Sequence, residues 1–171
     1  MNYFVLDPAN GTTAPNFANL FAVYNAANNF AAALAAPSGT LNRGAPMGNG
    51  TNLLTNQRTQ LALGAPNIAC VAGMMTCTAV IAKCGGSPYF VLHAGSGMLD
   101  ADARNTLNQL MATFGPAGQA VYVIPQHIYV ASYQRDIDEL NALGYDICFI
   151  TNPGESISSV QVNGAGDLYL A

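Results

Sequence analysis

The apolar residues of this chain fall mainly into short runs and alternations separated by Gly, Pro and Asn, a pattern typical of β-strands joined by turns. The longest such unit is Cys77 to His93, which predicts a hairpin with a Gly-Gly turn. A last hairpin is expected across Asn163-Gly164. The expected strands are Asn2 to Leu6, Arg58 to Leu63, Asn67 to Ala72, the two arms of Cys77 to His93, Gln119 to Ile124, His127 to Ala131, Tyr145 to Thr151, Ile157 to Val162 and Asp167 to Leu170.

Three other segments carry apolar residues at helical spacing. One begins near Pro15 and stops at Pro37, one is capped by Asp100 and stops at Gly115, and one runs from Ser132 to Leu143 and is closed by Gly144. The stretch from Ala36 to Asn56 is rich in Gly, Pro and Asn and is expected to be a long loop. Since hairpins are too frequent for a purely parallel sheet, the pattern predicts a mixed α/β or α+β fold with two layers in a single domain, residues 1–171, and of these we favour α+β.

Composition narrows the function classes. Only 8% of the residues are charged, five of them Lys or Arg, and the net charge is −4, so no basic stripe is available for nucleic acid. The amino terminus lacks the features of a signal peptide, and no run approaches the roughly 20 apolar residues of a membrane span, so we expect a soluble protein without a membrane partner. The four cysteines include no CxxC pair, and His93 and His127 stand far apart, which argues against a metal site and favours reduced thiols.

The hairpin places a thiol and an imidazole near its open ends. Residues opposite each other across a hairpin share a face, so Cys77 and His93 meet only if the turn has an odd length. A three-residue turn at Cys84 to Gly86 puts them directly opposite, one at Gly85 to Ser87 makes them diagonal neighbours, and a two-residue Gly-Gly turn separates them. If they meet, His93 can take the thiol proton and produce a nucleophile, with N–H groups around Met75 to Thr78 as candidate oxyanion donors.

The same residues also have a purely structural interpretation. Cys77 is then a small buried hydrophobe and His93 a hydrogen-bonded core residue. Other candidates are weaker: His127 as the base, Cys84 as a second exposed thiol, and an acidic helix face that is expected to be solvated. Cys70 and Cys148 are expected to be core residues.

The segment Met75-Thr76-Cys77-Thr78, the apolar strand after it, Gly85-Gly86 and the strand ending at His93 are similar to the active-site hairpin of the bacterial cysteine-dependent glutamine deamidases. This superfamily includes the Burkholderia lethal factor, the catalytic domain of the cytotoxic necrotizing factors and the CheD chemoreceptor deamidases. The resemblance covers only the hairpin and the residues just before it. It implies a mixed β-sandwich of two layers flanked by about three helices.

The resemblance also implies a reaction. Cys77 would be the nucleophile and His93 the base that convert a glutamine of a protein substrate to glutamate, without metal or organic cofactor. The protein would be a bacterial toxin or effector, secreted or injected without a Sec signal peptide and acting in the cytosol of a target cell. Some members orient the histidine with a threonine where this chain has Val71. Thr76 and a main-chain carbonyl near Cys70 or Val71 are the replacements considered. The alternative functions are a noncatalytic interaction protein and another thiol hydrolase, such as a protease or transglutaminase.

Overall fold

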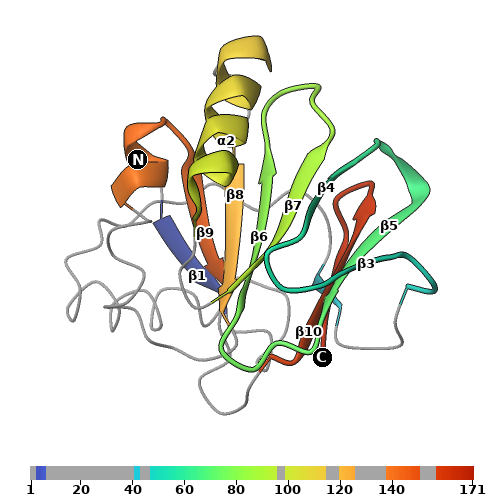
Figure 1. Ribbon diagram of the computed structural model, residues 1–171. Coiled ribbons are helices and arrows are strands. Elements are labelled where there is room, and N and C mark those ends of the chain that lie inside the picture. Colours follow the sequence, from blue (N-terminus) through green and yellow to red (C-terminus); the bar gives the residue numbers. More distant parts are fainter. Residues whose placement is uncertain are drawn as a thin grey trace.

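A computed structural model describes residues 3–6, 41–42, 47–95, 99–114, 120–125, 138–150 and 157–171. This part of the chain is α+β and mostly β-sheet, with one six-stranded and one five-stranded sheet. Its helical residues are those of α2 (Ala101–Phe114) and residues 138–142. Figure 1 shows the two sheets and the position of α2.

The six-stranded sheet has the order β1-β9-β8-β6-β7-β4 and mixes parallel with antiparallel pairs. Its strands are β1 (Tyr3–Leu6), β4 (Arg58–Leu61), β6 (Thr78–Lys83), β7 (Tyr89–Ala94), β8 (Ala120–Pro125) and β9 (Asp146–Ile150). The hairpin β6–β7 therefore lies inside this sheet, with β8 on one side and β4 on the other. Both hairpin strands are consequently held along both edges.

The five-stranded sheet has the order β2-β11-β10-β5-β3. Its strands are β2 (Leu41–Asn42), β3 (Thr51–Leu53), β5 (Gly64–Ala72), β10 (Ser159–Gly164) and β11 (Leu168–Leu170). The short strand β3 runs parallel to β5 at one edge, with Leu53 opposite Val71. As a result, β3 and β5 end at the same end of the sheet.

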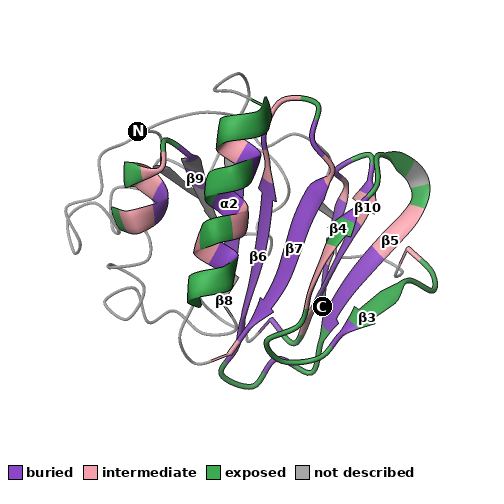
Figure 2. Ribbon diagram, turned by 45° about the horizontal axis from the view of Figure 1, so that its top comes forward, coloured by how far each residue is buried: buried purple, intermediate pink, exposed green. Residues whose placement is uncertain are grey.

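The two faces of the β6–β7 hairpin contribute to two different cores, because side chains alternate along a strand. Val80, Phe90 and Leu92 join a buried cluster with the inner face of α2. Ala79, Ile81 and Val91 join a second cluster that also contains Val160, Val162 and Leu168 of the other sheet. Both strands are buried along nearly their whole length (Figure 2). Strands that are buried on both faces have nearly continuous apolar sequences, and this is why the sequence predicts these two strands clearly.

Most predicted elements of the described part are confirmed within one to three residues, including the last hairpin. Asp100 caps α2 by accepting a hydrogen bond from the Ala103 N–H (2.7 Å), and Gly144 has a positive φ of 92° after residues 138–142. The prediction of a long loop from Ala36 to Asn56 is wrong in part, because β2 and β3 lie within it. The first predicted helix and the strand His127 to Ala131 lie outside the described residues.

Candidate active site

The register of the hairpin places Cys77 and His93 on the same face. Ala79 pairs with His93 and Thr78 with Ala94, so Cys77, one residue before β6, lies diagonally from His93. This is the register of a turn at Gly85 to Ser87, closed by a hydrogen bond from the Ser87 N–H to the Cys84 carbonyl (2.8 Å). Cys77 exposes 7% of its surface and His93 only 2%. Both side chains therefore lie at the buried face shared with the second sheet.

The imidazole of His93 is oriented by a main-chain carbonyl. Its Nδ1 lies 2.8 Å from the carbonyl oxygen of Leu53, at the end of β3. A carbonyl can only accept, so Nδ1 carries the proton and the neutral ring has its lone pair on Nε2. Among the described residues, this buried Nε2 has no hydrogen-bond partner. The orienting group is thus Leu53 and not Thr76 or a carbonyl of Cys70 or Val71.

The turn between β3 and β4 holds the end of β7 in place. Its Asn56 N–H donates to the His93 carbonyl (2.6 Å), and the His93 N–H donates to the Gln57 carbonyl (3.0 Å). Asn56 has a φ of 66°, a left-handed conformation that asparagine tolerates better than most residues. The backbone of the histidine is therefore fixed on the same side from which its ring is oriented.

Thr55, in the same turn, is a site residue that the sequence analysis missed. Its Oγ1 lies 3.9 Å from the Cys77 Sγ, and either group can donate. Thr55 follows a short polar strand within the stretch interpreted as a loop, so no apolar pattern marked it. The turn thus contacts both members of the predicted pair, the imidazole through Leu53 and the thiol through Thr55.

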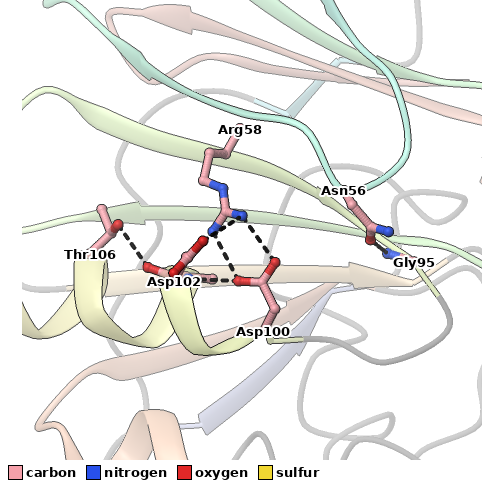
Figure 3. Close-up of polar contacts among 7 residues, drawn as sticks. Asn56, Arg58, Gly95, Asp100, Asp102 and Thr106 are labelled. Atoms are coloured by element: carbon pink, nitrogen blue, oxygen red, sulfur yellow. Dashed lines mark hydrogen bonds and ion pairs between the residues drawn. The ribbon is translucent and has the colours of Figure 1, made fainter.

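Gly95 connects the site to the same turn from the other side. Its N–H donates to the Asn56 Oδ1 (3.0 Å), as Figure 3 shows. A Cβ at this position would lie 2.9 Å from that oxygen and 3.3 Å from the Thr55 Cγ2. A side chain at position 95 would therefore displace the side chains of Asn56 and Thr55.

An ion pair fixes the beginning of β4 to α2. The Arg58 guanidinium binds both carboxylate oxygens of Asp100 (2.9 and 3.0 Å) and lies 3.8 Å from Asp102 (Figure 3). The pKa of Asp100 is held below its ordinary value, first by the Ala103 N–H and then by Arg58. Since the Asp100 carboxylate is half exposed, the pair contributes at most about 1 kcal/mol.

The other described thiols differ from Cys77 in their surroundings. Cys70 and Cys84 are free and buried, and burial raises the pKa of each. The Cys84 Sγ donates to the Tyr145 hydroxyl (3.2 Å), which in turn donates to the Leu107 carbonyl (2.9 Å). The alternative of Cys84 as an exposed thiol is therefore wrong. His127 and the side chain of Cys148 lie outside the described residues.

The described part of the chain also has a surface depression away from Cys77 and His93. A shallow depression of about 150 Å³ lies between β4 and α2, far along the sheet from Cys77, and it is lined by Gln60, Thr106, Gln109, Leu110, Thr113 and Phe114. Within the described ranges, no three His, Cys, Asp or Glu side chains are grouped to hold a metal ion. No helix in the described part of the chain has the length and apolarity needed to cross a membrane.

No protein-family model matches the chain, and no curated protein matches it.

Proposed function

We propose that this protein is a cysteine-dependent protein glutamine deamidase in which Cys77 is the nucleophile and His93 the base. The observation that carries the proposal is the His93 imidazole: its Nδ1 is held by the Leu53 carbonyl, and its buried Nε2 is without a hydrogen-bond partner among the described residues. A buried polar atom left unpaired costs about 1–3 kcal/mol, so its retention is more easily explained by a chemical role than by packing. The Cys77 thiol lies on the same sheet face, diagonally across the hairpin from His93.

The reaction follows from this arrangement. Nε2 takes the proton of the Cys77 thiol, and the thiolate attacks the carboxamide carbon of a substrate glutamine. The tetrahedral intermediate collapses as the imidazolium gives its proton to the leaving ammonia, which leaves a thioester. Water, deprotonated by Nε2, hydrolyses the thioester to glutamate and restores the thiol.

The developing oxyanion has candidate donors beside the thiol. Thr76 and Cys77 lie between the last hydrogen bond of the preceding loop, from the Met74 N–H to the Ser158 carbonyl, and the first ladder pair of β6 at Thr78. Within the described residues, their N–H groups belong to neither set of bonds. We assign the stabilisation of the oxyanion to the Cys77 N–H and its neighbour.

The proposal includes the fold and setting implied by the resemblance. Residues 1–171 would form one catalytic domain, a mixed β-sandwich of two layers flanked by about three helices. A buried cluster with members from both sheets supports the sandwich. The substrate would be a protein bearing the target glutamine, and the setting that of a bacterial toxin or effector acting in the cytosol of a target cell.

A noncatalytic interaction protein is the second candidate, and one observation favours it. Cys77 is 7% exposed and, among the described residues, makes no hydrogen bond to His93. In that case the thiol and the imidazole are core residues of the hairpin, and His93 adds nothing to the reactivity of Cys77. Another thiol hydrolase, such as a protease or transglutaminase, would share the dyad and differ in the bond that it cleaves or in the acyl acceptor.

Alkylation separates the catalytic from the noncatalytic candidate. At about pH 6.5, an ordinary thiol is about 1% thiolate, so a thiol activated by His93 reacts up to about a hundredfold faster with iodoacetamide. Peptide mapping after partial reaction compares Cys77 with Cys70 and Cys84 in the same molecule. We expect Cys77 to react first and His93→Gln to remove its advantage without loss of the thermal transition. Equal rates at the three thiols would refute the proposal that the protein is a cysteine-dependent enzyme.

The mass of a treated protein identifies the reaction. Incubation of candidate target proteins with wild type converts a glutamine to glutamate, a gain of about one dalton, whereas Cys77→Ser gives none. Cleaved chains would instead indicate a protease, and incorporation of an added amine would indicate a transglutaminase. Either result would replace the deamidase assignment while leaving the dyad intact.

A further inference from the structure

Two large apolar side chains are exposed on the two segments that carry the site. Leu54 is 68% exposed and precedes Thr55, and Met75 is 77% exposed and lies two residues before Cys77. They are two of the four exposed large hydrophobic residues in the described part of the chain. Isolated exposed apolar residues are ordinary, but two that flank the same thiol are a candidate surface for recognition.

The strand pairing brings these two segments to the same end of the molecule. β3 runs parallel to β5, with Leu53 opposite Val71, so residues 54–57 and residues 73–77 both leave from the ends of these strands. The contact of 3.9 Å between Thr55 and Cys77 joins the two segments. In Figure 2 both are exposed at the same end of the sheets.

The rim formed by residues 53–57 and 73–77 has no charge. Neither segment contains Asp, Glu, Lys or Arg. The next charged residue, Arg58, is bound by Asp100 and Asp102 instead of facing the rim (Figure 3). A charged substrate segment would therefore find no charged partner among residues 53–57 and 73–77, whereas a neutral apolar one would cover Leu54 and Met75.

On the basis of the function proposed above, we propose that the rim selects a glutamine flanked by apolar residues in a neutral segment of the protein substrate. Leu54 and Met75 contact the residues on the two sides of the glutamine, and Thr55 and Cys77 lie between them. Selectivity thus comes from apolar contact. It does not weaken with salt, unlike recognition through ion pairs.

The test uses two tripeptides that label the thiol irreversibly. Each has in its centre a glutamine analogue in which the carboxamide nitrogen is replaced by CH2Cl, so attack by the Cys77 thiolate forms a carbon–sulfur bond and releases chloride. One peptide carries leucine on both sides of the analogue and the other serine. Intact mass measured against time and concentration gives the second-order labelling rate for each.

Three variants complete the design. Leu54→Ser and Met75→Ser remove the apolar contacts from exposed positions, where the fold tolerates substitution. Leu63→Ser is the matched control, because Leu63 is also exposed (48%). It lies at the other end of β5, about 25 Å from the end of that strand where the rim begins. Iodoacetamide, which has no flanking residues, reports the intrinsic reactivity of Cys77 in every variant.

We expect the leucine peptide to label wild type about tenfold faster than the serine peptide, and this rate not to fall between about 0.05 and 0.5 M NaCl. Leu54→Ser and Met75→Ser lower the preference about threefold each, whereas Leu63→Ser keeps the wild-type preference and every variant keeps the wild-type iodoacetamide rate. Equal labelling by the two peptides, or variants that match the control, would overturn the selectivity and leave the deamidase standing.

Two other outcomes would overturn the proposed function or the assignment of the rim to a substrate. A Cys77 that no reagent labels faster than Cys70 ends the proposed function together with its specificity. A concentration-dependent dimer of wild type, lost in the double variant of Leu54 and Met75, would assign the rim to a second copy of the chain and refute substrate recognition there.

Discussion

The contact between Thr55 and Cys77 predicts a measurable effect on thiol reactivity. Thr55→Val keeps the shape of the side chain and removes its hydroxyl, whereas Thr55→Ser keeps the hydroxyl. The 3.9 Å between Oγ1 and Sγ is near the outer limit for a hydrogen bond to sulfur, so we take the value of an ordinary hydrogen bond and not the larger value of a bond to a charged group. This is about 1 kcal/mol, or about fivefold in rate.

The assay is the rate of iodoacetamide labelling of Cys77 at about pH 6.5, followed by peptide mass. We expect Thr55→Val to react about fivefold more slowly and Thr55→Ser within twofold of wild type. Thr55 is exposed, so neither change should alter the free energy of unfolding by more than about 0.5 kcal/mol. The reasoning fails if valine reacts like threonine, or if serine is as slow as valine.

Two further predictions follow from the surroundings of the site. Gly95→Ala places a Cβ 2.9 Å from the Asn56 Oδ1 and 3.3 Å from the Thr55 Cγ2, so it should displace these side chains and, through Thr55, slow labelling of Cys77, whereas Gly86→Ala, with open space around it, should not. Asp100 has a lowered folded pKa, so its stabilisation is complete above the ordinary carboxyl pKa of about 3.9 and is lost as the pH falls below it. Urea unfolding at about pH 6 and 3 should therefore show a loss, at most about 1 kcal/mol from this half-exposed group, that is absent in Asp100→Asn.

The hairpin strands were predictable from sequence because both faces of β6 and β7 are buried. Their register was not, since Gly85-Gly86 is compatible with three turns that differ in which residues share a face. Ser87 distinguishes them in the structure: its hydroxyl accepts from the Cys84 N–H (3.1 Å) and donates to the Pro88 carbonyl (2.8 Å). These are local bonds of a single side chain, and an apolar pattern does not record them.

The partner of His93 could not be predicted for a different reason. β3 contains two exposed polar residues and a single buried one, Leu53, so it shows no strand pattern over its three residues. The strand β3 forms because it pairs with β5. The carbonyl of its last residue, Leu53, contacts the imidazole of His93, which lies 40 positions later in the sequence. Thr55 was missed together with it. The nucleophile and the base were visible as residue types, whereas the groups around them depend on long-range pairing.

The Leu53 carbonyl has a consequence for how this site tolerates mutation. The main-chain oxygen that orients His93 is present whatever amino acid occupies position 53, so a scan of side-chain substitutions through residues 51–57 would not delete it. Genetic variation can remove the thiol or the imidazole in one step but can weaken their alignment only by displacing the backbone. An ester in place of the amide between Leu53 and Leu54, introduced by chemical synthesis, would weaken the acceptor and leave every side chain intact.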